Sequence, residues 1–257
     1  MTKQETSNLT MAMAYSGETL DLTDISDIII DKHSTGGVGD KITIILMPII
    51  SALGIPVAKI TNMDEPVGQS IGTQLEIIES VNALKGSMSK DVEEITYALA
   101  AQILIMANKS KNIEEAYSLI KETINSGKAY EKFKQLVIQQ CGDISYIEDL
   151  SKFKSANYIV PVLSKKAGYV SKINTEEIGK ISSFIGAGRQ TKNDIIDFQA
   201  GIIMNKKIND FVSVNEPLLY IHTNKKEVLE EATLRLQNSF TISENKVDKL
   251  NNIIKII

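Results

Sequence analysis

The sequence contains little of what disulfides, thiol catalysis and metal clusters require. It has a single cysteine, Cys141, and two histidines among its 257 residues. One cysteine cannot form an intrachain disulfide, which favours a reducing compartment. Cys141 lies just before Gly142 at the end of a helical pattern, so we expect neither a catalytic thiol nor a cluster of metal-ligating side chains there.

Basic charge and long hydrophobic runs are scarce as well. The formal net charge is −4 and the pI is about 5.4, which argues against a nucleic-acid-binding protein because such proteins carry a basic face. The most apolar stretch, residues 44–58, is too short to span a bilayer and contains Pro48 and Pro56. The first residues lack the apolar segment of a signal peptide, so we expect a cytoplasmic protein without a membrane or nucleic-acid partner.

The composition and the order of the apolar runs predict an α/β protein. Hydrophobic residues make up 43% of the chain and charged residues 23%, as in ordinary soluble proteins. Apolar runs at residues 28–31 and 56–60 flank a helical pattern over residues 40–53. This strand, loop, helix and strand order predicts a parallel sheet in a first domain over residues 1–150, with a ligand at the carboxyl ends of the strands.

The remainder of the first domain is expected to be helical. Helical periodicity covers residues 67–84, and Ser89 indicates a second helix start. Asn112 is expected to cap a helix that ends at Gly127, and a further helical stripe covers residues 130–137. We interpret these apolar stripes as core packing.

Residues 151–257 are expected to form a separate C-terminal α+β domain. Short β-like runs alternate with turns at residues 158–163, 168–173, 201–205 and 217–222. A charged amphipathic helix is expected over residues 225–236. The pattern resembles the flattened barrel of biotinyl and lipoyl carrier domains, so we expect a barrel-sandwich-like fold.

The most informative segment lies between the first predicted strand and the first predicted helix. Residues 31–41 read Asp-Lys-His-Ser-Thr-Gly-Gly-Val-Gly-Asp-Lys. Glycine-rich turns that lead into a helix often bind phosphate, because the backbone can approach the anion and the helix N-terminus supplies unpaired N–H groups. Lys32 adds charge, and Ser34 and Thr35 add hydroxyl donors. The spacing matches neither the Walker A pattern nor the dinucleotide G-x-G-x-x-G pattern. The alternative is a glycine-rich turn without a ligand.

Residues 32–40 belong to a set of short motifs that are spread along the chain. The others are Leu9-Thr10-Met11-Ala12-Met13 with Ser16-Gly17, Asp64-Glu65-Pro66-Val67-Gly68, Gly72 with Leu75-Glu76, Ser126-Gly127-Lys128-Ala129 and Gly186-Ala187-Gly188-Arg189. Together they resemble the thymidine/pyrimidine-nucleoside phosphorylase family. The resemblance implies a pentosyltransferase that cleaves the N-glycosidic bond of thymidine or uridine with inorganic phosphate as co-substrate, giving free base and (deoxy)ribose 1-phosphate.

Two blocks of that family have no counterpart in this sequence. One is the family's N-terminal helical segment, on which its dimers largely rely, so a homodimer remains one of several oligomeric states. The other is a central block that would fall near residues 59–63, where the chain passes directly from one strand-like run to the Asp64-Glu65-Pro66 motif. In the family this block carries the Arg, Ser and Lys that hold the pyrimidine base, whereas the only arginines here are Arg189 and Arg235, far downstream.

The resemblance assigns roles to several residues of the phosphate segment. Lys32, Ser34 and Thr43 would bind phosphate, and Thr61 lies at the junction where the family has a further phosphate-binding serine. His33 would face the sugar or the base as a catalytic residue, and its alternative role is to cap a carbonyl in the loop. Asp40 is expected to cap the helix that follows.

The resemblance also implies a monovalent cation, because bacterial members of the family hold one between the phosphate loop and a second segment. The ligands implied here are the backbone carbonyls of Gly39, Lys41, Val67 and Ser70 and the carboxylate of Glu79. Oxygen ligands of this kind suit a potassium ion. The alternative for Glu79 is a position on an exposed helix face.

Two other functions compete with phosphorolysis. Without the base-binding block, the chain would be a catalytically impaired phosphate-binding protein. A phosphoribosyltransferase is the third alternative, since anthranilate-type transferases are structurally related and use a Gly-Thr-Gly-Gly loop, although their acidic metal-binding pairs are not evident here. A deletion through a sheet also exposes edges or apolar faces, so the fold is expected to have repacked around Thr61.

Overall fold

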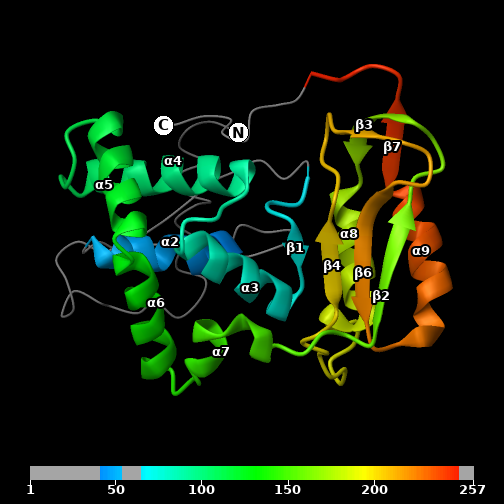
Figure 1. The fold of residues 1–257 in the computed structure, drawn as a ribbon, viewed down its shortest axis with the longest axis horizontal. Helices are drawn as coiled ribbons and strands as arrows, with labels where there is room; N and C mark the ends of the chain where they lie inside the picture. The colour runs from blue at the N-terminus through cyan, green and yellow to red at the C-terminus, as the bar shows by residue number, and fades with distance from the viewer. Residues whose placement is uncertain (1–40, 54–64, 249–257) are drawn as a thin grey trace, which may run out of the picture.

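The computed structural model describes residues 41–53 and 65–248, which form a helical lobe and a sheet lobe side by side (Figure 1). The helical lobe contains α2 (Lys41–Ala52), α3 (Thr73–Leu84), α4 (Lys90–Met106), α5 (Ile113–Asn125), α6 (Lys128–Gln139) and α7 (Ser145–Glu148). The sheet lobe contains β1 (Ser70–Ile71), β2 (Tyr158–Leu163), β3 (Gly168–Ile173), α8 (Thr175–Ser182), β4 (Gly201–Met204), β5 (Phe211–Val212), β6 (Pro217–Thr223), α9 (Leu229–Asn238) and β7 (Phe240–Ser243). Short 3₁₀ turns at Leu150–Lys152 and Lys226–Val228 and a π turn at Ser183–Ala187 complete the described elements.

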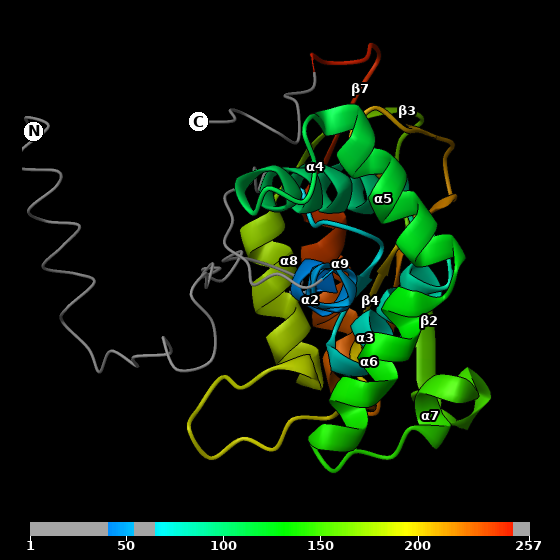
Figure 2. The same cartoon turned by 90° about the vertical axis from the view of Figure 1, so that its left-hand side faces the viewer.

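Helix α2 is the centre of the helical lobe. Its apolar residues Ile42, Ile45, Leu46, Ile49 and Ile50 are all buried, as expected for a helix that is hydrophobic on nearly every side. Figure 2 looks along α2 and shows it surrounded by other helices, and α2 contacts α3, α4, α5 and α6. The position of α2 is therefore fixed by its packing against these four helices.

The cap predicted at Asn112 is confirmed, whereas the cap predicted at Asp40 lies outside the described residues. The side chain of Asn112 accepts a hydrogen bond from the backbone N–H of Glu115 at 2.9 Å and so caps α5. Gly127 has a φ of 76°, a left-handed conformation that glycine adopts without strain, and it separates α5 from α6. Helix α4 begins at Lys90, one residue after the predicted start at Ser89.

The sheet lobe consists of two antiparallel sheets with α8 and α9 against them. One sheet has the strand order β1-β4-β6-β2 and the other the order β5-β3-β7. Buried residues from both sheets and both helices form a single core. The predicted runs at residues 158–163 and 168–173 match β2 and β3, and those at 201–205 and 217–222 match β4 and β6 to within one residue.

The helix predicted over residues 67–84 is wrong in its first turns. Helix α3 begins only at Thr73, while Ser70 and Ile71 form strand β1 and pair with Ile203 and Ile202 of β4. Ile71 is buried in the core of the sheet lobe, which a helical conformation would not allow. The tertiary pairing has therefore overridden the local helical pattern.

The predicted parallel sheet stays a prediction. It rests on residues 28–31 and 56–60, which lie outside the described residues, as does the predicted helix at 9–16. Every strand pair within residues 65–248 is antiparallel. The domain boundary at residue 150 also stays a prediction.

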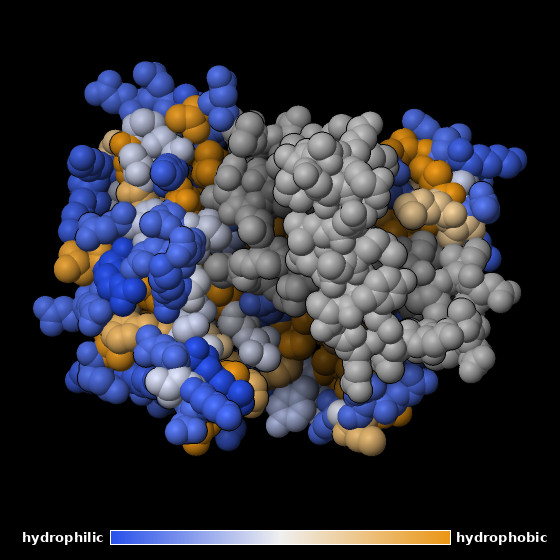
Figure 3. Space-filling model, turned by 180° about the vertical axis from the view of Figure 1, so that it is seen from behind, coloured by the Kyte–Doolittle hydropathy of each residue, from blue (hydrophilic) through white to orange (hydrophobic). Residues whose placement is uncertain are grey.

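The face of the molecule opposite that of Figure 1 shows mostly polar side chains among the described residues (Figure 3). Seen from behind, both lobes show hydrophilic side chains interspersed with single apolar ones (Figure 3). None of the helices in residues 41–53 and 65–248 is long and apolar enough to cross a membrane.

Candidate functional site

The structure describes only part of the predicted site. Lys32, His33, Ser34, Gly39 and Thr61 lie outside the described residues, so their roles stay predictions. Thr43 lies within α2, but the structure describes only its backbone, so its role also stays a prediction. The remaining predicted residues are Lys41, Val67, Ser70 and Glu79, and the structure brings all four together.

Lys41 is the first residue of α2, and its side chain is fully buried. Its ammonium donates a hydrogen bond to the carbonyl oxygen of Val67 at 2.5 Å and a second, shorter one to the carbonyl oxygen of Ser70. It also lies 3.4 Å from Oε2 of Glu79. The start of α2 is thus tied to the loop before β1 and to helix α3.

Glu79 reaches the same loop from α3. Its two carboxylate oxygens accept hydrogen bonds from the backbone N–H groups of Gln69 and Ser70, each at 2.8 Å. The side chain is only 15% exposed, so Glu79 does not lie on an exposed helix face. The loop presents its amides to the carboxylate and its carbonyls to the ammonium of Lys41, which is a complementary pattern of charge.

Gly68 allows the loop to close over this ion pair. It has a φ of 71°, and a β-carbon at this position would lie 2.4 Å from Oε1 of Glu79 and 2.8 Å from Cδ of Lys41. Both the conformation and the close approach therefore require glycine. The Gly68 within the Asp64-Glu65-Pro66-Val67-Gly68 motif has a structural reason to be there.

A second ion pair holds the same loop from the sheet lobe. The ammonium of Lys207 lies 3.2 Å from Oδ2 of Asp91 and donates a hydrogen bond to the carbonyl oxygen of Pro66. The same oxygen of Asp91 accepts a hydrogen bond from the N–H of Gly68 at 2.8 Å. Burial by itself would raise the pKa of Asp91, but the charge of Lys207 and the hydrogen bonds from Gly68 and Lys207 outweigh it and lower this pKa to about 2.

The sequence analysis missed Asp91 and Lys207. They lie 116 residues apart and on different lobes, and no spacing rule connects them. The Glu65 carboxylate also accepts a hydrogen bond from the N–H of Ile208 at 3.0 Å. Residues 65–70 are thus the joint between the two lobes.

The three residues around Lys41, which are Val67, Ser70 and Glu79, have oxygen atoms that would suit a potassium ion. However, the ammonium of Lys41 already lies among the carbonyls of Val67 and Ser70 and the carboxylate of Glu79. A second cation bound to the same oxygens would meet this positive charge within a few ångströms. The described residues therefore do not fit a free cation at this point. Within the described ranges there is also no group of three or more His, Cys, Asp or Glu side chains that could hold a metal ion.

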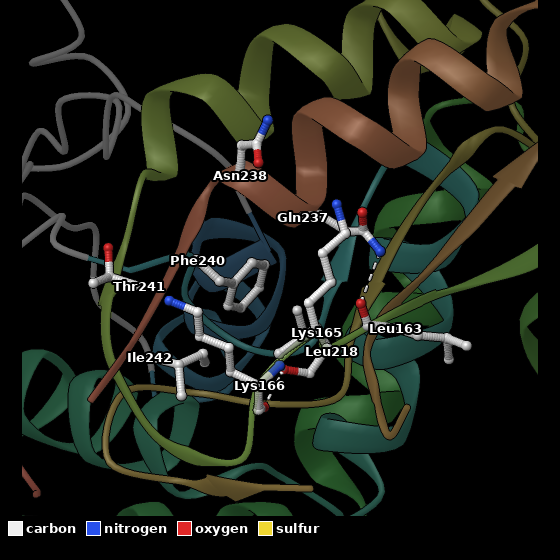
Figure 4. A pocket seen from close by; sticks show the side chains of 10 residues that line it. Leu163, Lys165, Lys166, Leu218, Gln237, Asn238, Phe240, Thr241 and Ile242 are labelled. Carbon is white, nitrogen blue, oxygen red and sulfur yellow. Dashed lines mark hydrogen bonds between the residues drawn. The ribbon is translucent and has the colours of Figure 1, made fainter. Parts of the chain in front are cut away.

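A separate cavity of about 280 Å³ lies in the sheet lobe (Figure 4). It is bounded by the end of α9, by β7 and by the turn after β2. Its polar lining comes from Ser164, Lys165, Lys166, Gln237, Asn238 and Thr241. The side chain of Gln237 donates to the carbonyl oxygen of Leu163 at 2.9 Å. No residue of the Lys41 cluster lines it, so it is not part of the predicted site.

Comparison with known proteins finds relatives of both lobes. Residues 169–243 match the family model described as "Pyrimidine nucleoside phosphorylase C-terminal domain". A "Pyrimidine-nucleoside phosphorylase" of Staphylococcus epidermidis (strain ATCC 12228) is 29% identical over 384 residues, which cover 100% of this chain and 88% of the relative. A protein of the same description from Staphylococcus aureus (strain USA300) is 29% identical over 374 residues, which cover 96% of this chain and 86% of the relative.

The length of these alignments carries a further finding. The alignment with the S. epidermidis protein extends over 384 residues, whereas this chain has 257. Residues of the relative must therefore lie opposite internal gaps in this chain. The chain lacks an internal stretch that these relatives have, as the spacing of its motifs predicts.

Proposed function

We propose that the chain is a member of the pyrimidine-nucleoside phosphorylase family and catalyses the phosphate-dependent cleavage of a pyrimidine nucleoside. The products are the free base and (deoxy)ribose 1-phosphate. The observation that carries the proposal is the alignment with a phosphorylase over 100% of the chain, which includes the glycine-rich segment at residues 32–40.

In the proposed reaction, phosphate attacks C1′ of the sugar as the base leaves. The sugar develops positive charge in the transition state, so catalysis depends on positioning and electrostatics and needs no covalent nucleophile. Lys32 and Ser34 hold the phosphate, together with Thr43 and Thr61. His33 faces the sugar or the base.

The described residues support this proposal through the position of α2. The glycine-rich segment ends at Asp40, and α2 begins with the next residue, Lys41. Since five apolar side chains of α2 are buried and its first side chain is tied to Val67, Ser70 and Glu79, the segment leads into a well-packed helix. A small displacement of a phosphate ligand costs much of the rate, so a fixed helix start favours catalysis.

The test is the release of uracil or thymine from uridine or thymidine, followed by chromatography, with and without inorganic phosphate. We expect release only with phosphate, and a loss of at least about 100-fold in Lys32→Ala. Lys121→Ala is the matched control, because Lys121 is exposed on α5, and it should leave the rate unchanged. Phosphate-independent release, or no release at all, contradicts the proposal.

A second candidate function is phosphate binding without cleavage. The observation that favours it is the internal stretch missing from the chain, since the resemblance locates the base-binding Arg, Ser and Lys in the missing central block. A base site needs donors and acceptors for the pyrimidine edge. The missing Arg, Ser and Lys are the side chains that would supply them. This candidate predicts that phosphate raises the melting temperature of the protein but not that of Lys32→Ala, while neither releases base.

A further inference from the structure

We propose that the ammonium of Lys41 replaces the monovalent cation that the resemblance implies for this site. The implied ligands are the carbonyls of Gly39, Lys41, Val67 and Ser70 and the carboxylate of Glu79. Three of these groups, from Val67, Ser70 and Glu79, surround Lys41 Nζ. The chain thereby carries its own positive charge at this position. The proposal concerns stability and ion dependence, and it holds whether or not the chain cleaves nucleosides.

The ammonium is paired within the protein by two hydrogen bonds and one ion pair. A lysine ammonium has three donors and no acceptor. Here it faces three acceptors, namely two carbonyl oxygens and one carboxylate oxygen. The side chain is fully buried, so these protein oxygens take the place of water around the charge. A buried charge is tolerated when it is paired and hydrogen-bonded in this way.

The surrounding loop is built around the lysine stem as well as around its charge. A β-carbon on Gly68 would lie 2.8 Å from Cδ of Lys41, so the loop backbone passes directly over the aliphatic part of the side chain. The N–H groups of Gln69 and Ser70 hold the Glu79 carboxylate in place beside the ammonium. A free cation would have to displace Lys41 from all of these contacts.

A covalently attached charge has a different consequence from a bound ion. A bound ion stabilises the folded state in proportion to its concentration, whereas Lys41 is always present. The link between the start of α2 and the loop at residues 67–70 is therefore independent of potassium. Under the proposed phosphorolysis, the reaction also needs no added potassium.

The first experiment compares the melting temperature of the unaltered chain in potassium chloride and in tetramethylammonium chloride at equal ionic strength. Tetramethylammonium is too large to enter an oxygen cage of this kind. We expect the same melting temperature in both salts. A rise in potassium chloride alone would overturn the proposal, because it would show that the cation position is still open.

The second experiment opens the position by substitution. Lys41→Ala removes the ammonium and leaves space, and Lys41→Met removes the charge but fills the space. Both should lower the melting temperature by roughly 10 °C in tetramethylammonium chloride, since each leaves Glu79 without its partner. Potassium chloride should restore part of this loss in Lys41→Ala and none in Lys41→Met.

Lys206→Ala is the matched control for a general salt effect. Lys206 also donates to a carbonyl oxygen, that of Phe211, and pairs with a carboxylate, that of Glu216, with 16% of its side chain exposed. The melting temperature that Lys206→Ala loses should not be restored by potassium chloride. Equal restoration of Lys41→Ala and Lys206→Ala, or equal responses of Lys41→Ala and Lys41→Met, would contradict the proposal. If Lys41→Ala does not fold, the comparison of salts on the unaltered chain decides alone.

Discussion

Two lysines hold the loop at residues 65–70 from opposite sides, in different surroundings. Lys41 reaches the loop from the helical lobe and is fully buried, whereas Lys207 reaches it from the sheet lobe with 20% of its side chain exposed. Each donates to a loop carbonyl and pairs with one carboxylate, Glu79 or Asp91. Since the chemistry is alike, burial decides how much each pair contributes, because water can compensate a lost partner only where it has access.

The largest effect is expected when Glu79 is removed. Glu79→Ala leaves the Lys41 ammonium buried without a counter-charge and frees two loop amides. We expect the free energy of unfolding to fall by about 3 to 5 kcal/mol, measured by urea denaturation. Glu79→Gln keeps the shape and one acceptor oxygen and should lose less. A loss below about 1 kcal/mol in Glu79→Ala would mean that burial does not set the contribution of this pair.

The next effect tests how closely the loop packs on the buried pair. Gly68→Ala introduces a β-carbon 2.4 Å from Oε1 of Glu79, at a φ of 71°. We expect a loss of about 3 kcal/mol from strain and overpacking together. Gly86→Ala is the matched control, since Gly86 has a φ of 94° with nothing within 4 Å of an added β-carbon. It should lose about 1 kcal/mol, and equal losses in the two variants would rule out close packing at Gly68.

The third prediction uses pH to probe the partly exposed ion pair between Lys207 and Asp91. The pKa of Asp91 is about 2 in the folded protein, below the ordinary value of 3.8, so the unfolded state binds its proton more readily. Asp91 therefore stabilises the fold by about 2 kcal/mol above pH 4, and this contribution disappears as the pH falls from about 4 to about 2.

Lys207→Met should flatten this dependence, because the charge of Lys207 is the largest influence that lowers the pKa of Asp91. Urea denaturation at pH 6, 4 and 3 measures both chains. The same slope between pH 4 and pH 3 in the two proteins would show that Lys207 does not control Asp91.

The sequence predicts most of the described elements but not the joint between the lobes. The cap at Asn112 and strands β2, β3, β4 and β6 follow from local patterns. Strand β1 does not, because its two residues are extended only through pairing with β4 and through burial of Ile71 in the sheet lobe. Local periodicity carries no information on a pairing partner more than a hundred residues away.

The candidate site could also be predicted only in part. The family resemblance brings Lys41, Val67, Ser70 and Glu79 into one set, and the structure assembles them. The resemblance treats Lys41 as a carbonyl ligand, and only the folded structure reveals its ammonium among the other oxygens. The direction of a long side chain depends on the packing around its stem, which a motif does not encode.

The smallest effect is expected from a third lysine pair, which is exposed. Lys180 and Glu176 are one helical turn apart on α8, with 2.6 Å between Nζ and Oε1 and side chains 59% and 78% exposed. The contact is shorter than that between Lys41 and Glu79, but solvent screens it and its side chains lose rotamer freedom to form it. Glu176→Gln should leave the midpoint of urea unfolding unchanged within error. If the midpoint shifted as far as in Glu79→Ala, distance rather than burial would govern these pairs, and the contrast between Lys41 and Lys207 would need another cause.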